Sequence, residues 1–131
     1  MSRGRVVVIE DDIDVAATLL DELVGRDYEV MTATTAKEGL EVVDAFRPDV
    51  VLLDISLPGL SGPGLLTVFG RVHPWLPVIV VTSTVDPRIL ARIADHKPFH
   101  LVNKPYDLEA LDRLVAAAAD ESRTRAGRPA F

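Results

Sequence analysis

The sequence predicts an α/β fold in which helices cover both faces of a parallel five-stranded sheet. Short apolar stretches typical of strands alternate five times with amphipathic stretches typical of helices. The central stretch, residues 50–53, is continuously apolar, which suits a strand buried on both faces. It ends on Asp54, and the turn signal Pro58-Gly59 follows. Open α/β sheets carry their chemistry at the carboxyl ends of strands, so Asp54 is the first candidate for a functional residue.

The first strand is expected at residues 5–9, a β-branched run that ends in Glu10-Asp11-Asp12. Apolar residues at helical spacing predict a helix over residues 13–24. Either Asp12 or Asp14 could cap its start, and Gly25 is placed to end it. A second strand, with alternating character, follows at residues 28–32.

The sequence Thr35-Ala-Lys-Glu38 is a capping box that opens the second helix. Arg47-Pro48 stops this helix ahead of the central strand. A third helix is expected over residues 62–72, although Gly64 and Gly70 weaken its pattern.

The fourth strand is predicted at residues 78–81 and ends in Thr82. A short helix follows over residues 87–94. Pro98 restricts Lys97 to extended backbone, so this helix should end early.

The fifth strand is minimal, residues 101–102, and leads into Lys104-Pro105. Asp107 is placed to cap the last helix. Beyond residue 119 the apolar period is lost. We therefore expect one domain over residues 1–119 and a flexible C-terminal tail over residues 120–131.

Composition narrows the classes of function. Apolar residues make up 48% of the chain and charged residues 26%, as in ordinary globular proteins. The chain has no cysteine, which excludes disulfides and thiolate zinc sites, and no apolar run reaches the roughly 20 residues of a membrane helix. A cytoplasmic location without membrane contact is expected. The net charge of −6 disfavours direct nucleic-acid binding and favours a protein partner or a cation.

Polar residues follow four of the predicted strands, and together they suggest one site. Glu10 and Asp11 follow the first strand, Asp54 ends the third, Thr82 the fourth, and Lys104 follows the fifth. Because parallel strands end at one edge, these groups can converge. Three carboxylates repel one another unless positive charge lies among them, which Lys104 and Mg²⁺ would supply. An aspartate can attack phosphorus as a nucleophile, so the chemistry suggested is an aspartyl phosphate.

Each residue also has an ordinary structural interpretation. An acid after a strand is often a helix cap, a Thr there a turn residue, and a Lys before Pro a solvated charge. The joint pattern at four strand ends is much harder to assign to chance. Structural roles are expected for three histidines and the tryptophan, namely His73, His96, His100 and Trp75.

Residues 4–119 resemble the receiver domain of response regulators in two-component signalling. Glu10-Asp11 matches the acidic pair of that family, and Asp54 its phosphoacceptor, with Leu57-Pro58 and Gly62 following. Thr82 matches the hydroxyl position, and Lys104-Pro105 matches a Lys-Pro pair whose peptide bond is typically cis. The resemblance implies a flavodoxin-like (βα)5 three-layer sandwich with strand order 2-1-3-4-5.

The resemblance also implies a function. Receivers accept a phosphoryl group from a histidine kinase or phosphotransfer protein, here onto Asp54, and catalyse no more than this uptake and slow dephosphorylation. The implied metal is Mg²⁺, for which Mn²⁺ or Ca²⁺ can substitute. Its implied ligands are Asp11, Asp54 and the backbone carbonyl of Ser56, with Glu10 acting mainly through water. Phosphorylation would draw Thr82 inward and rearrange the face made by the fourth helix, fifth strand and fifth helix. That face often dimerises in the family, which leaves a homodimer open.

The chain departs from the family pattern in its readout residues. Leu101 stands where the family usually has an aromatic that moves with the Thr, and the stretch 95–100 lacks the usual glycine. Ser56 and Thr84, two residues beyond Asp54 and Thr82, are short and offer no acid or amide to position water. A long-lived phosphoryl group is therefore expected.

The leading hypothesis is a stand-alone receiver that signals through a protein target. A receiver-like module whose binding ignores phosphorylation is the alternative, motivated by Leu101 and Pro98. A Mg²⁺ phosphohydrolase with Asp54 as nucleophile is disfavoured because such enzymes need a second acid where Ser56 stands. A flavin carrier is disfavoured because the acidic sequence after the first strand repels phosphate.

Overall fold

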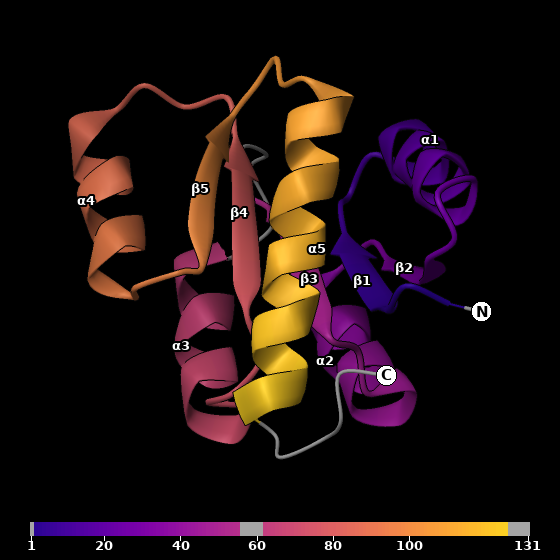
Figure 1. Cartoon of the computed structure of the whole chain (residues 1–131). Coiled ribbons are helices and arrows are strands. Elements are labelled where there is room, and N and C mark those ends of the chain that lie inside the picture. Colours follow the sequence, from indigo (N-terminus) through magenta and orange to yellow (C-terminus); the bar gives the residue numbers. More distant parts are fainter. Residues whose placement is uncertain (1, 56–61, 126–131) are drawn as a thin grey trace.

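The computed structural model describes residues 2–55 and 62–125, and within them the chain forms a five-stranded parallel sheet and five helices (Figure 1). The strands are β1 (Arg5–Ile9), β2 (Glu29–Ala33), β3 (Val50–Asp54), β4 (Val78–Thr82) and β5 (His100–Asn103). The helices are α1 (Ile13–Val24), α2 (Ala36–Phe46), α3 (Gly62–Val72), α4 (Pro87–Asp95) and α5 (Leu108–Arg125). The strand order is β2-β1-β3-β4-β5, as predicted. The flavodoxin-like fold class is therefore confirmed.

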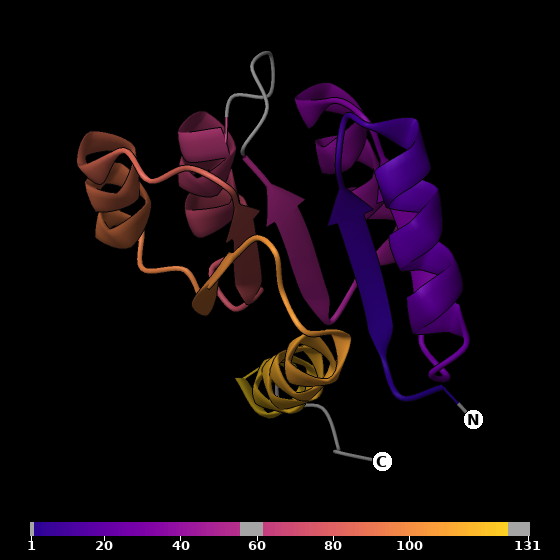
Figure 2. The same cartoon turned by 90° about the horizontal axis from the view of Figure 1, so that it is seen from above.

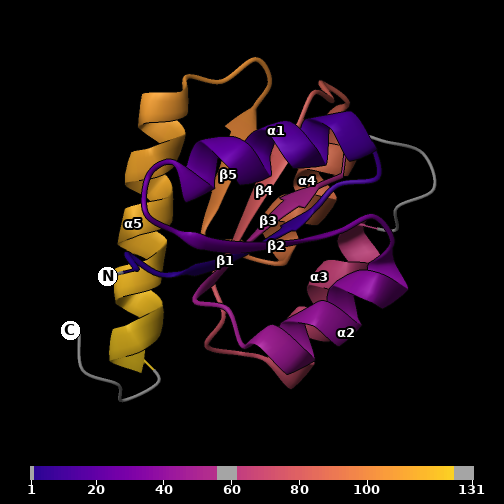
Figure 3. The same cartoon turned by 90° about the vertical axis from the view of Figure 1, so that its right-hand side faces the viewer.

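Each central strand sends alternate side chains to two separate cores. Val7 and Ile9 of β1 pack with residues of α2, α3 and α4. Val6 and Val8 pack with residues of α1 and α5. Figures 2 and 3 show the corresponding layers, with α1 and α5 on one side of the sheet and α2, α3 and α4 on the other. The continuous apolar runs in β3 and β4 follow from burial on both faces.

Capping at the start of α1 settles which acid is structural. Asp12 is the cap, and its carboxylate accepts from the backbone N–H groups of Asp14 at 3.0 Å and Val15 at 3.2 Å. Asp14 therefore lies inside the first turn. Because Asp12 caps α1, Asp11 is not required as the helix cap and is available to the site.

The end of α4 corrects one expectation. Lys97 is not extended but left-handed, with φ at +50°. Its backbone N–H donates to the carbonyl of Ala94 at 3.0 Å, which closes the last turn after Asp95. Arg47 ends α2 in the same way, with φ at +53° before Pro48. A following proline disfavours the right-handed region, and a left-handed residue still ends the helix and reverses the chain.

The last helix corrects the boundary of the predicted tail. Residues 120–125 are not a tail but continue α5 as far as Arg125. Ser122 is fully buried, and Arg123 donates to the backbone carbonyl of Arg3 at 2.7 Å. Arg123 also lies 3.5 Å from the buried carboxylate of Asp49. These tertiary contacts hold the last turns although the apolar period has ended, and residues 126–131 lie outside the described residues.

Strand bounds differ from the predicted ones by a residue or two. Strand β2 begins at Glu29, and the N–H of Tyr28 donates instead to the carbonyl of Leu23 near the end of α1, at 3.1 Å. Strand β5 is longer than the minimal pair predicted, since His100 and Asn103 pair with β4.

Across residues 2–55 and 62–125, no helix combines the length and apolarity required to cross a membrane.

Candidate functional site

The predicted residues converge at the carboxyl edge of the sheet. Asp54 lies opposite Val81 in the β3–β4 pairing, and Thr82 lies opposite Asn103 in the β4–β5 pairing. The N–H of Lys104 donates to the carbonyl of Thr82 at 2.9 Å, which extends the ladder by one residue. The strand ends are therefore fixed to one another by backbone hydrogen bonds before any side chain is considered.

Lys104 reaches the phosphoacceptor candidate directly. Its ammonium nitrogen Nζ donates to Oδ2 of Asp54, and the two side chains form an ion pair. Asp54 is 6% exposed, so its carboxylate is largely shielded from water, whereas the Lys104 side chain is 27% exposed. The Lys104-Pro105 peptide bond is cis, as the family resemblance implied. The ion pair orients the Asp54 carboxylate and places a positive charge beside it.

The pKa of Glu10 is clearly shifted from its ordinary value. Burial and, after it, the neighbouring Asp54 raise the pKa of its carboxyl to about 8, against the opposing effect of Lys104. Glu10 is 1% exposed. When it is protonated, Glu10 can donate a hydrogen bond to the Asp54 carboxylate, whereas two ionised carboxylates have no donor to share. Positive charge near Glu10 would reverse this preference for the protonated form.

Three buried carboxylate oxygens of the acidic pair lack hydrogen-bond partners within the described residues. They are both oxygens of Glu10 and Oδ1 of Asp11. A buried acceptor without a partner costs about 1 to 3 kcal/mol, and more when it is charged. Hard, anionic oxygens of this kind are what Mg²⁺ binds, so the donor set fits the cation implied by the family.

The described residues do not form a complete metal cage. No group of three or more His, Cys, Asp or Glu side chains in ranges 2–55 and 62–125 is placed to hold a metal ion, so Glu10, Asp11 and Asp54 do not form such a group. Mg²⁺ itself takes few protein ligands and completes its shell with water and phosphate oxygens. The backbone carbonyl of Ser56 was also predicted as a ligand. Ser56 lies outside the described residues, as does Leu57-Pro58 of the family motif.

Thr82 and Leu101 occupy the positions expected for the readout. Thr82 is fully buried, and its Oγ1 accepts from the N–H of Thr84 at 3.1 Å. Leu101 lies opposite Val80 and is half-buried against the core beneath α4. Position 101 thus carries an aliphatic side chain that takes part in packing.

Tyr106 is a neighbour of the site that sequence reasoning missed. Burial raises the pKa of its phenol, and the charges of Glu22, Asp54 and Glu10 raise it further. The ring therefore lies within electrostatic range of both site acids. The available signal was an aromatic residue directly after Lys104-Pro105.

The histidines and the tryptophan lie apart from these acids. Nε2 of His73 is 3.0 Å from Oδ1 of Asp44, and Nε2 of His96 is 2.8 Å from the Thr67 hydroxyl. Both contacts link neighbouring elements, in keeping with structural roles. Trp75 is 44% exposed and packs edge-on against His73, with ring centroids 5.8 Å apart.

A parallel sheet of this order, with an acidic pair and a Lys–Asp ion pair at its carboxyl edge, defines a receiver-type fold. The sequence model of the response regulator receiver domain matches residues 6–116. The chain belongs to this family.

Curated relatives include the DNA-binding transcriptional regulator NtrC of Escherichia coli K12, which is 36% identical over 121 residues. That match covers 90% of this chain and 25% of NtrC. The transcriptional regulatory protein KdpE of Mycobacterium tuberculosis H37Rv is 36% identical over 115 residues, covering 86% of this chain and 50% of KdpE. The chain thus spans a quarter to half the length of these relatives.

Solved structures of receiver domains are similar in fold. The CheY-like receiver domain protein of Methanospirillum hungatei JF-1 has a TM-score of 0.84 and 25% identity, over 92% of this chain and 97% of that one. A receiver domain protein of Clostridium thermocellum has a TM-score of 0.85 and 24% identity, over 93% and 98% of the two chains.

Proposed function

We propose that this receiver accepts a phosphoryl group on Asp54 from a histidine kinase or phosphotransfer protein and signals by altered protein binding. The observation that carries this proposal is the cluster at the carboxyl edge, where Lys104 holds Asp54 beside an acidic pair with unpartnered oxygens. Such a cluster is costly as a purely structural feature, because three buried oxygens of Glu10 and Asp11 have no hydrogen-bond partner within the described residues.

In the proposed reaction an oxygen of Asp54 attacks phosphorus as the phosphorus–nitrogen bond to the donor histidine breaks. The bonding electrons leave with the imidazole, and an oxygen–phosphorus bond forms in their place. Lys104 orients the carboxylate beforehand and is close enough to pair with an incoming phosphoryl oxygen. Asp11 and Asp54 would hold Mg²⁺, with Glu10 contributing through water, and the bound ion would offset the phosphoryl charge.

Acetyl phosphate or beryllofluoride with millimolar Mg²⁺ tests this proposal. Amide NMR signals close to Asp54 and Thr82 should shift, and intact-mass spectrometry should show one added phosphoryl group with acetyl phosphate. Asp54→Asn should abolish the added mass. Failure of the wild type to respond to either reagent would overturn the proposal.

A phosphorylation-independent interaction module is the second candidate, because Leu101 lacks the ring that the family uses in its readout. The two candidates differ in one measurement. If beryllofluoride shifts amides near Asp54 but leaves those of α4 and β5 unchanged, the second candidate is favoured.

A further inference from the structure

Helix α4 is packed on the rest of the molecule mainly at its carboxyl end. It lies at the outer edge of its helix layer (Figure 1), and Ile93, in its last turn, is its one buried residue. Val85, just before the helix, is 87% exposed, and Ile89 in the first turn is 36% exposed. Apolar burial therefore holds the end of α4 much more firmly than its start.

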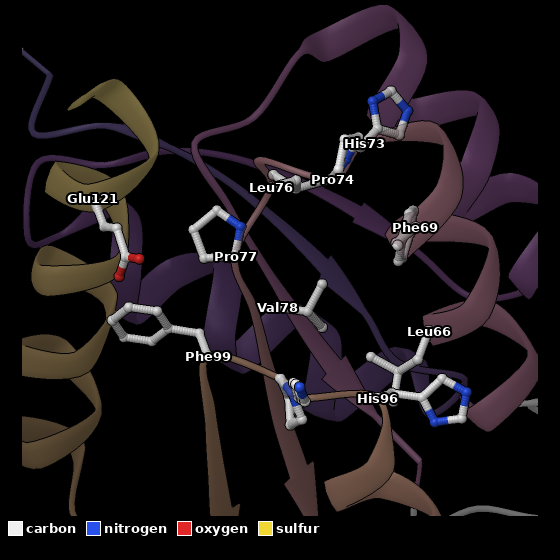
Figure 4. A pocket seen from close by; sticks show the side chains of 13 residues that line it. Leu66, Phe69, His73, Pro74, Leu76, Pro77, Val78, His96, Phe99 and Glu121 are labelled. Carbon is white, nitrogen blue, oxygen red and sulfur yellow. The ribbon is translucent and has the colours of Figure 1, made fainter. Parts of the chain in front are cut away.

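A hydrogen bond between side chains also fastens the carboxyl end of α4 to α3. Nδ1 of His96, the residue after α4, lies 2.7 Å from the backbone carbonyl of Arg92, so Nδ1 carries the proton and donates. In the neutral ring Nε2 then accepts, and the hydroxyl of Thr67 on α3 donates to it at 2.8 Å. Figure 4 shows the His96 ring beside Leu66 of α3. We call Ile93 and the His96–Thr67 bond the α4 anchor.

The start of α4 is connected differently, by three hydrogen bonds in series that begin at Thr82. Oγ1 of Thr82 accepts from the N–H of Thr84 at 3.1 Å, and Oγ1 of Thr84 accepts from the N–H of Asp86 at 3.2 Å. The carboxylate of Asp86, the cap of α4, accepts from the N–H of Arg88 at 2.9 Å. This last bond lowers the pKa of the Asp86 carboxyl below its ordinary value. We call the series the β4–α4 ladder.

No further polar contact supports the start of α4 within the part of the chain that the structure describes. Across residues 2–55 and 62–125, no hydrogen bond or ion pair joins residues 85–90 to another helix or to a strand. The ion pair of Arg88, for example, is with Asp86 on the same turn. The polar contacts that place the first turn of α4 are therefore those of the ladder, which starts at the Thr82 hydroxyl.

A movement of the Thr82 hydroxyl must change this ladder. The bond to Thr84 is 3.1 Å long, close to the upper limit for an N–H···O bond. If the hydroxyl turns toward a phosphoryl group on Asp54, this bond either breaks or draws Thr84 with it. In both cases the first turn of α4 is displaced, while the α4 anchor stays in place. Leu101 packs in the core beneath α4, so this route does not require an aromatic ring at position 101.

We propose that α4 pivots about the α4 anchor when Asp54 is phosphorylated, and that the β4–α4 ladder carries the movement of Thr82 to the first turn of α4. The pivot rests on the proposed function, because it requires a phosphoryl group or its analogue at Asp54.

Amide NMR of the whole chain, with and without beryllofluoride and Mg²⁺, tests the pivot. In the wild type the shifts should be largest at Asp86, Arg88 and Ile89 and should decline along α4 toward residues 93–96. Beryllofluoride is preferred to acetyl phosphate because hydrolysis of a phosphoryl group then plays no part. The amides of residues 54 and 82 report separately whether the site is occupied.

Thr84→Val tests the ladder, because valine keeps the branched shape but lacks the oxygen that holds Asp86. Without beryllofluoride, the amides of Asp86 and Arg88 should exchange with solvent about fivefold faster than in the wild type, the factor expected for one hydrogen bond. With beryllofluoride, residues 54 and 82 should still shift, whereas the shifts at the start of α4 should be lost. Thr84→Ser retains the hydroxyl and should match the wild type in both measurements.

His96→Ala tests the α4 anchor by removing the bond to Thr67. The end of the helix should then move as well, so the shifts caused by beryllofluoride should extend to residues 93–97. His100→Ala, an exposed histidine on β5, is the matched control and should keep the wild-type decline along α4. Thermal melts confirm that each variant is folded.

The outcomes separate the pivot from the proposed function. No shift near Asp54 in the wild type would overturn both. A shift near Asp54 with α4 unchanged, or with equal shifts from residue 86 to residue 95, would overturn the pivot alone. The pivot would also be refuted by Thr84→Val matching the wild type in exchange and in shifts, or by His96→Ala keeping the decline along α4.

Discussion

Asp54 and Glu10 are neighbouring buried acids with opposite electrostatic surroundings. The Lys104 ammonium forms an ion pair with one oxygen of Asp54 and favours its ionised form. Burial and the nearby Asp54 raise the pKa of Glu10 and favour its protonated form. The sequence predicted which residues meet, because polar residues follow the carboxyl ends of the strands and a parallel sheet places those ends together. The sequence could not show that the oxygens of Glu10 lack partners, or whether Asp12 or Asp14 caps α1. Both depend on distances of a few ångströms between side chains.

The first prediction concerns Glu10→Gln in EDTA. The folded pKa of Glu10, about 8, lies above its ordinary 4.5, so the folded state binds more protons between these values. Wild-type stability should therefore fall as pH rises from about 5 to 8, by up to about 1.4 kcal/mol per pH unit from this group. Gln does not titrate, so the advantage of the variant should grow with pH. Urea unfolding of both proteins at several pH values measures their free energies of unfolding. A difference between the two proteins that does not change with pH would contradict the prediction.

A second prediction concerns Thr84, whose N–H donates to Thr82 and whose side chain offers no acid or amide. Hydrolysis of the aspartyl phosphate requires a positioned water, so the wild-type phosphoryl group should last well beyond seconds at neutral pH. Thr84→Asn should shorten that lifetime by supplying an amide. Decay of the phosphorylated mass after removal of acetyl phosphate gives both rates. A wild-type half-life of seconds would refute the expectation.

Elements were predicted best where periodicity alone decides them. The bounds of α1 and α3 agree with the predicted ranges; in α1 the apolar spacing and the end signal Gly25 coincide, and α3 forms although Gly64 and Gly70 weaken its pattern. The end of α5 was missed because Ser122 and Arg123 are held by contacts with residues far away in sequence. The left-handed Lys97 was missed because a proline rule excludes one backbone region without choosing between the others.

The left-handed end of α2 leads to a third prediction. Arg47 has φ at +53°, a conformation that costs a side-chain-bearing residue about 1 kcal/mol relative to glycine. Arg47→Gly should therefore raise the free energy of unfolding by up to about 1 kcal/mol. Urea unfolding measures the change. The control Arg113→Gly, within α5, should lower stability by a similar amount.

The two helical glycines give a fourth prediction with opposite signs. Gly70→Ala should stabilise the protein by about 1 kcal/mol, because the new methyl group meets open space. Gly39→Ala should destabilise it by about 1 kcal/mol or more, because crowding against buried Ile9 exceeds the gain in helix propensity. Thermal and urea unfolding of both variants test this, and equal signs would contradict the packing argument.

At the scale of the whole molecule, the acidic cluster couples cation binding to folding. Mg²⁺ at ten times its Kd should stabilise the protein by about 1.4 kcal/mol, or about 3 to 5 °C in Tm. Asp11→Asn removes a proposed ligand and should reduce that gain, whereas Asp44→Asn, on the exposed face of α2, should retain it. Calorimetry with and without Mg²⁺ provides the measurement. An equal Mg²⁺ response in Asp11→Asn would count against Asp11 as a ligand.

The bond between Arg123 and the carbonyl of Arg3 brings the first strand and the last helix together at the amino-terminal edge of the sheet. Within the described residues, the segment before β1 and the end of α5 thus lie at the same edge of the sheet, opposite the carboxyl ends of the strands. Domains whose two ends lie close together tolerate grafting into the surface loop of a host protein. Residues 3–123 of this receiver domain are accordingly suited to insertion into a surface loop of a host protein through two short linkers.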